Sequence, residues 1–139
     1  MSGGENFFDT NVLLYLLSAD AAKADRAEEL LAGGGTVSVQ VLNEFASVAS
    51  RKLHMPWDEI REVLAQVRVV CVVEPMGLET HDAALRVAQR YGLSIYDALI
   101  VAAALLAGCK TLQSEDMQDG QLIEGKLTIR NPFRQMISK

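Results

Sequence analysis

The stretch that decides the fold is Ser94-Ile95-Tyr96-Asp97-Ala98-Leu99-Ile100-Val101-Ala102-Ala103-Ala104-Leu105-Leu106-Ala107-Gly108. Every residue from Ala98 to Ala107 is apolar. Alanine and leucine are strong helix formers, and the stretch is too short to cross a bilayer as a helix. Because a helix that is apolar on all sides belongs in the interior of a soluble domain, we expect this helix at the centre of the fold.

The two ends of this helix are marked by capping residues. Ser94 is a good N-cap, and Asp97 stands three residues later in a pattern that resembles a capping box. Gly108 suits the position just after the last turn. Asp97 therefore places a carboxylate in the first turn, where the helix dipole favours negative charge. This stretch alone fits Asp97 equally as a capping residue and as a functional acid.

Length and charge limit the class of protein. The chain has 139 residues, half of them apolar, and a formal net charge of −5, which predicts a single domain over residues 1–139 with a real core. So acidic a chain does not suit a clamp on duplex DNA or a protein that binds membrane surfaces. Cys71 and Cys109 lie in apolar surroundings and are expected to be buried thiols. The first five residues show no signal peptide, so we expect a cytoplasmic protein with no membrane attachment.

Strand-like and helical segments alternate along the chain, which predicts an α/β domain around a mostly parallel sheet. The expected strands are Asn6–Asp9, Thr36–Val39, Val69–Val73, Lys110–Leu112 and Leu127–Ile129. The expected helices are Val12–Ser18, Ala21–Leu31, Val41–Lys52, Trp57–Arg68, Gly77–Tyr91 and the helix that Ser94 caps. The run Val69–Val73 is continuously apolar and is predicted to be buried on both faces of the sheet.

Four acids fall where such a sheet binds ligands, outside the carboxyl ends of its strands. Asp9 ends the first strand, Glu44 opens the helix after the second, and Asp116 follows the strand at residues 110–112, while Asp97 opens the central helix. Four converging carboxylates would repel one another without a cation. Oxygen ligands without a partnering His or Cys suit Mg²⁺, or Mn²⁺, better than zinc.

The segments that carry these acids resemble the PIN domain, and among PIN domains the VapC-type toxins of bacterial toxin–antitoxin pairs. The matching segments are Phe8-Asp9-Thr10-Asn11-Val12-Leu13, Asn43-Glu44, Tyr96–Ala104 and Ser114-Glu115-Asp116-Met117-Gln118-Asp119-Gly120. The resemblance implies a three-layer α/β/α sandwich with a sheet of about five short strands. It also implies a Mg²⁺-dependent endoribonuclease that hydrolyses RNA phosphodiester bonds.

The resemblance assigns roles residue by residue. Asp9, Glu44, Asp97 and Asp116 would be the catalytic, metal-binding quartet, and Asn11 and Ser114 match polar positions that support it. Asp119 matches an auxiliary acid in the same loop, and the choice of Asp116 or Asp119 as the fourth acid stays open. The number of metal ions stays open too.

The resemblance further implies an RNA substrate, a cognate antitoxin that inhibits the enzyme, and a homodimer. Trp57 and Met55 are candidates for the groove that receives the antitoxin, although both could fill the core instead. Candidate RNA contacts are Arg51, Lys52, Lys110, Arg130 and Arg134, although scattered basic residues usually only make a protein soluble. Two other functions remain as alternatives: a PIN-type nuclease of RNA processing or repair, and a non-catalytic binding module.

Overall fold

A computed structural model describes residues 5–134 of the chain. Its strands are β1 (Asn6–Phe8), β2 (Gly35–Ser38), β3 (Cys71–Glu74), β4 (Thr111–Gln113), β5 (Leu122–Ile123) and β6 (Leu127–Arg130). Its helices are α1 (Thr10–Leu14), the 3₁₀ helix η1 (Tyr15–Leu17), α2 (Ala21–Ala32), α3 (Val39–Arg51), α4 (Trp57–Val70), α5 (Leu78–Tyr91) and α6 (Ile95–Leu106).

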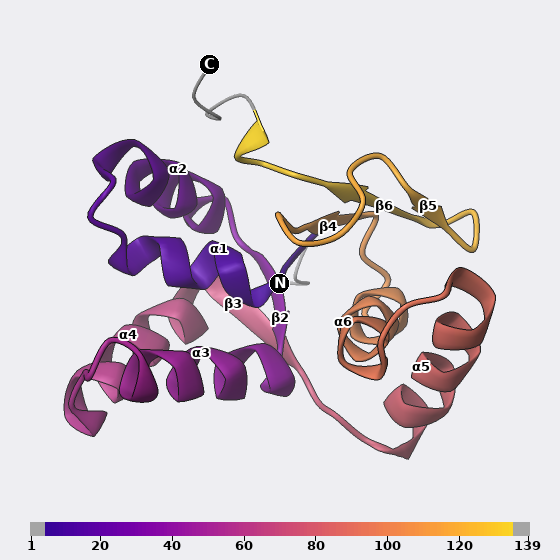
Figure 1. Cartoon of the computed structure of the whole chain (residues 1–139), viewed down its shortest axis with the longest axis horizontal. Helices are drawn as coiled ribbons and strands as arrows, with labels where there is room; N and C mark the ends of the chain where they lie inside the picture. The colour runs from indigo at the N-terminus through magenta and orange to yellow at the C-terminus, as the bar shows by residue number, and fades with distance from the viewer. Residues whose placement is uncertain (1–4, 135–139) are drawn as a thin grey trace.

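The strands form one sheet in the order β3-β2-β1-β4-β6-β5. All neighbouring strands pair in parallel except β5, which is antiparallel to β6. Helices α1 to α4 lie on one side of the sheet and helices α5 and α6 on the other, which gives three layers (Figure 1). The predicted fold class is therefore confirmed. The sheet has one strand more than expected, because β5 is only two residues long and leaves no pattern in the sequence.

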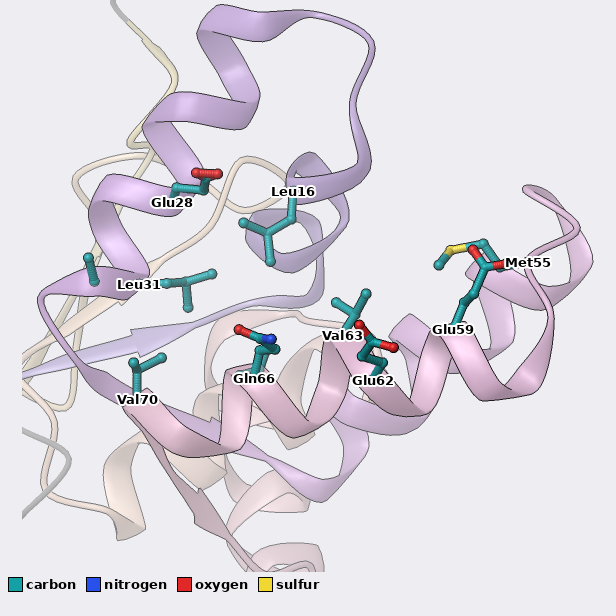
Figure 2. Close-up of a pocket in the computed structure, with 11 residues that line it drawn as sticks. Leu16, Glu28, Leu31, Met55, Glu59, Glu62, Val63, Gln66 and Val70 are labelled. Atoms are coloured by element: carbon teal, nitrogen blue, oxygen red, sulfur yellow. The ribbon is translucent and has the colours of Figure 1, made fainter.

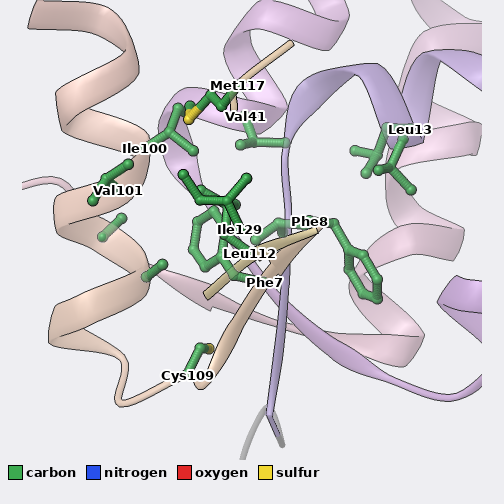
Figure 3. Close-up of a cluster of buried hydrophobic side chains, with 14 of the residues drawn as sticks. Phe7, Phe8, Leu13, Val41, Ile100, Val101, Cys109, Leu112, Met117 and Ile129 are labelled. Carbon is green, nitrogen blue, oxygen red and sulfur yellow. The ribbon is translucent and has the colours of Figure 1, made fainter. Parts of the chain in front are cut away.

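The core lies on both faces of the central strands (Figure 3). Successive side chains of a strand point to opposite faces, so Phe7 lies on the side of α6 while Phe8 lies on the side of Leu13. Phe7, Leu112 and Ile129 come from adjacent strands, and none of the three is exposed to solvent. Helix α6 packs against them, and its residues Ala98 and 100–104 are buried, as the apolar stretch predicted.

The prediction of a fully buried strand at Val69–Val73 is wrong. Helix α4 continues to Val70, and Val69 is 84% exposed. Strand β3 begins at Cys71 and lies at the edge of the sheet, so that Val72 is 43% exposed. A run of valines fits a helix end and an edge strand as well as a central strand, and only the strand order separates these cases.

The first helix, the two cysteines and the helix lengths can also be compared with the expectations from the sequence. The helix expected at residues 12–18 is α1 followed by η1, and its N-cap is Asp9. Cys71 and Cys109 are buried free thiols, as expected. Among the described residues, none of the helices is both long and apolar enough to span a membrane.

Candidate functional site

Asp9 lies at the carboxyl edge of the sheet, directly after β1, and is only 6% exposed. Its Oδ1 accepts a hydrogen bond from the backbone N–H of Thr10 at 2.7 Å and so caps α1. Its Oδ2 accepts from Oγ of the buried Ser114 at 2.7 Å. Ser114 follows β4, the parallel neighbour of β1, so the strand order itself brings these two residues together.

Asn11 connects Asp9 with the loop that follows β4. Its Nδ2 lies 3.1 Å from Asp116 Oδ2 and 3.4 Å from Asp9 Oδ2. Its Oδ1 accepts from the backbone N–H of Glu115 at 3.2 Å. Ser114 Oγ also accepts from the backbone N–H of Asp116 at 3.2 Å. One amide and one hydroxyl therefore fix Asp116 beside Asp9.

Glu44 reaches the same edge from α3 and is held at both oxygens. Its Oε1 accepts from Thr10 Oγ1 at 2.6 Å, and its Oε2 accepts from Gln40 Nε2 at 3.1 Å. Gln40 Nε2 also lies 3.2 Å from the backbone oxygen of Tyr96, in the first turn of α6. These bonds link α1, α3 and α6 at the position where Asp97 projects from α6.

Asp97 takes part in the N-cap of α6, because its backbone N–H donates a hydrogen bond to Ser94 Oγ at 3.2 Å. Its half-buried carboxylate also interacts electrostatically with the other acids. Burial raises the pKa of Asp97, and the charges of Asp116 and Glu44 raise it further. The two interpretations of Asp97 that the sequence allowed are therefore compatible with each other.

Burial raises the pKa of Asp9 from 3.8 to about 6. The hydrogen bonds from Ser114 and Thr10 oppose this rise, and the negative charges of Asp116 and Glu44 add to it. The same two carboxylates thus act on both Asp9 and Asp97. Among the described residues, the structure brings the four predicted acids into one electrostatic cluster, in which the neighbouring charges that raise the two pKa values are carboxylates.

The chemistry of this cluster suits a hard divalent cation, since every candidate ligand is an oxygen. Within residues 5–134, no three His, Cys, Asp or Glu side chains form a group that could hold a metal. Both carboxylate oxygens of Asp9 and of Glu44 are instead engaged by hydrogen bonds.

Asp119 lies in the same loop as Asp116 but makes contacts of another kind. Its Oδ1 accepts from the backbone N–H of Asn131 at 2.8 Å, and its Oδ2 lies 2.6 Å from Arg134 Nη1. These two bonds lower the pKa of the Asp119 carboxyl group. This geometry favours Asp116 over Asp119 as the fourth acid and gives Asp119 a role in holding the C-terminal segment.

Three residues at this site were not predicted as site residues. Gln40 lies one turn before Glu44, and this spacing of four residues on one helix face was the available signal. Thr10 donates from Oγ1 to Glu44 Oε1 at 2.6 Å. Tyr15 donates from its hydroxyl to Glu115 Oε1 at 2.6 Å, which ties the loop after β4 to the 3₁₀ helix η1.

A separate groove of about 470 Å³ lies between η1, α2 and α4 (Figure 2). Its apolar lining includes Leu16, Leu31 and Val63, and acidic side chains at its border come from Glu28, Glu59 and Glu62. Met55 lines this groove as well. Trp57 is 63% exposed, so it does not fill the core.

Comparison with known proteins gives a consistent fold. Residues 7–118 match the model of the PIN domain family. A toxin–antitoxin complex from Klebsiella pneumoniae contains a similar chain, with 20% identity, 92% of this chain and 98% of that chain covered, and a TM-score of 0.70. Mycobacterium tuberculosis VapC20, a toxin that cleaves the sarcin-ricin loop, is 21% identical over 81% of this chain and 90% of its own, with a TM-score of 0.62.

A third similar structure is VapBC2 from Rickettsia felis, bound to a DNA fragment from its promoter. It is 18% identical, with 91% of this chain and 97% of that chain covered and a TM-score of 0.64. At these identities the likeness establishes the fold. No match was found among curated protein sequences.

Proposed function

Since the chain belongs to the PIN-domain family, we propose that it is a metal-dependent endoribonuclease, a toxin held inactive by a cognate antitoxin. The observation that carries this proposal is the cluster of four carboxylates at the carboxyl edge of the sheet. Asp9 has a pKa raised to about 6 within it, by burial first and then by the neighbouring charges. A cluster that holds negative charge at this cost is stabilised by a cation.

Asp9, Glu44, Asp97 and Asp116 would hold the metal, with Mg²⁺ as the expected ion and Mn²⁺ as a substitute. When bound, the metal would lower the pKa of a water molecule, which makes it a better nucleophile, and would neutralise negative charge on the scissile phosphate. The chain's own polar groups orient the acids: Ser114 and Asn11 act on Asp9 and Asp116. Gln40 and Thr10 hold Glu44 in the same manner. Loss of such supporting bonds typically costs 10–100-fold in metal affinity or activity.

The groove between η1, α2 and α4 is the proposed seat of the antitoxin. The similar structure from Klebsiella pneumoniae is a toxin–antitoxin complex. An apolar floor bordered by Glu28, Glu59 and Glu62 suits an amphipathic segment that carries Lys or Arg beside its apolar residues. The proposal extends to a homodimer and to cytoplasmic action on RNA.

A cleavage assay on total cellular RNA tests the activity. The wild-type protein should cleave in Mg²⁺, and EDTA should stop the reaction. Asp97→Asn should abolish cleavage, while Asp82→Asn, which removes an exposed carboxylate on α5, should leave it intact. Circular dichroism of both variants verifies the fold. Cleavage by folded Asp97→Asn at the wild-type rate, or recovery after EDTA with zinc alone, would contradict the assignment.

Growth of the host tests the toxin assignment separately. Expression without a partner should arrest growth, and the arrest should require Asp97. Equal growth with wild-type and Asp97→Asn proteins, together with cleavage in vitro, would favour a PIN-type nuclease of RNA processing or repair.

A further inference from the structure

Strands β4 and β6 present a polar face on the side opposite their buried residues. Thr111 pairs with Thr128 and Gln113 pairs with Arg130, whereas the intervening Leu112 is fully buried. Because side chains alternate along a strand, the four paired polar residues share one face. Two adjoining cavities of about 660 and 640 Å³ lie along this part of the molecule, and Arg130 lines both.

The charge of this surface is opposite to that of the whole protein. Basic residues lining the two cavities are Arg26, Lys110, Lys126, Arg130 and Arg134. The acidic lining residue is Asp119 alone. We call the surface formed by the lining residues of both cavities the basic groove. In a chain with a net charge of −5, such local concentration of positive charge indicates an anionic ligand.

Some of these cations already have partners. Arg134 is 2.6 Å from Asp119, Arg26 is 2.8 Å from Glu29, and Lys110 is a loose 3.8 Å from Glu5. Lys126 and Arg130 are exposed, and neither forms an ion pair within residues 5–134. Glu124 lies near Lys126 and Asp119 lies near Arg130, but without an ion pair these two cations are still the ones most available to a ligand.

The basic groove begins next to the candidate active site. The backbone oxygen of Arg130 accepts from the N–H of Ser114 at 2.9 Å, and Ser114 Oγ in turn donates to Asp9. The loop at residues 114–120 separates the two surfaces: Asp116 contacts Asn11 on one side, and Asp119 contacts Arg134 on the other. A strand that follows the basic groove past this loop would arrive at the four acids.

We infer that the basic groove binds the phosphate backbone of single-stranded RNA and leads it to the active site, with Lys126 and Arg130 as phosphate contacts. This inference rests on the proposed ribonuclease function. Lys and Arg bind phosphates without regard to sequence, so the groove supplies affinity and register, and the selection of a cleavage site comes from elsewhere. A single strand fits better than a duplex because a chain with a net charge of −5 does not suit a clamp on duplex nucleic acid.

Binding of a fluorescein-labelled oligouridylate to the Asp97→Asn protein, followed by anisotropy at several salt concentrations, tests the groove. Introducing both Lys126→Gln and Arg130→Gln into the Asp97→Asn protein, as the groove pair, should weaken RNA binding at least several-fold. It should also reduce the slope of log affinity against log salt by about 1.4, which is about 0.7 for each lost contact with a single strand. The matched control is Arg61→Gln with Arg68→Gln on α4, which removes the same charge on the far side of the molecule (Figure 1).

In the cleavage-competent protein, the groove pair should raise KM with little change in kcat, and the α4 pair should change neither. Equal loss of binding in both pairs would overturn the inference, because net charge alone would then explain it. The inference would also be overturned if the protein bound duplex DNA more tightly than RNA and if the groove pair abolished this DNA binding. If the groove pair leaves RNA binding unchanged while cleavage still requires Asp97, the groove is refuted and the nuclease stands. If no RNA is bound or cleaved, both fail.

Discussion

Asn11 donates a hydrogen bond from Nδ2 to Oδ2 of Asp116 over 3.1 Å, although 105 positions separate the two residues in the chain. The same nitrogen lies 3.4 Å from Asp9 Oδ2. One neutral amide thus stands between two carboxylates that raise each other's energy. It holds the loop after β4 against the first helix.

We expect Asn11→Ala to weaken metal binding more than it weakens the fold. The substitution removes the shared donor and the acceptor of the Glu115 N–H, so Asp116 is no longer fixed beside Asp9. The Mg²⁺ concentration for half-maximal cleavage should rise about 10–100-fold. Gln118→Ala, an exposed amide in the same loop, is the control and should leave this concentration unchanged. Equal Mg²⁺ dependence of the two variants would remove Asn11 from the site.

Asp9 should make the metal-free protein more stable in mild acid. Its pKa is about 6 in the folded state, because of burial first, against 3.8 for the free side chain. Between these values the folded state binds a proton that the unfolded state has released, so the free energy of unfolding falls as the pH rises through this window. The full difference is worth up to about 3 kcal/mol.

Urea unfolding in EDTA at about pH 4.5 and pH 7 measures this contribution. The wild-type protein should lose stability relative to Asp9→Asn between the two pH values, because the variant cannot ionise at this position. Subtracting the variant cancels the titration of the groups that do not interact with Asp9. A difference between the two proteins that does not change with pH would mean that Asp9 ionises normally in the folded state.

The parts of the fold that the sequence predicted depend on local signals. Helix α6 follows from its apolar composition and its capping serine, and both are found. The gathering of Asp9, Glu44, Asp97 and Asp116 follows from the rule that parallel strands end at one edge. Their catalytic and metal-binding roles remain predictions, since proximity and raised pKa values do not by themselves establish chemistry.

The parts that were missed depend on distant partners. Asp116 and Asp119 are equivalent in the sequence and differ only because Asn11 lies beside one and Arg134 beside the other. The valines at residues 69–73 have the composition of a central strand, but the first two end α4, and the edge position of β3 that exposes Val72 follows from pairing with β2 alone. Neither distinction is encoded in nearby residues.

Gly35→Ala should destabilise the protein without touching the acids. A Cβ at this position would lie 2.5 Å from Cε2 of Phe8 and 2.8 Å from the backbone oxygen of Asn6, and Phe8 is fully buried and cannot move aside. We expect a loss of about 1–3 kcal/mol in the free energy of unfolding, as for overpacked cores. Gly33→Ala is the control, since its Cβ would meet only an ordinary contact of 3.5 Å. Urea unfolding that is equally affected in both variants would show that β1 and β2 separate easily.

Asp116→Asn and Asp119→Asn should change the melting temperature in opposite directions, although they remove the same charge from the same loop. The charge of Asp116 raises the pKa of both Asp9 and Asp97, so its neutralisation relieves repulsion and should raise the melting temperature in EDTA by a few degrees. Asp119 accepts hydrogen bonds from Asn131 and Arg134, so its neutralisation should lower the melting temperature.

Millimolar Mg²⁺ should stabilise the wild type through binding and thereby narrow or reverse the higher melting temperature of Asp116→Asn. It should stabilise Asp119→Asn as much as the wild type, because that variant keeps all four acids. Thermal melts of the three proteins with EDTA and with Mg²⁺ decide the matter: a melting temperature of Asp116→Asn at or below that of the wild type in EDTA, with no response to Mg²⁺ in either protein, would mean that the acids do not form one site.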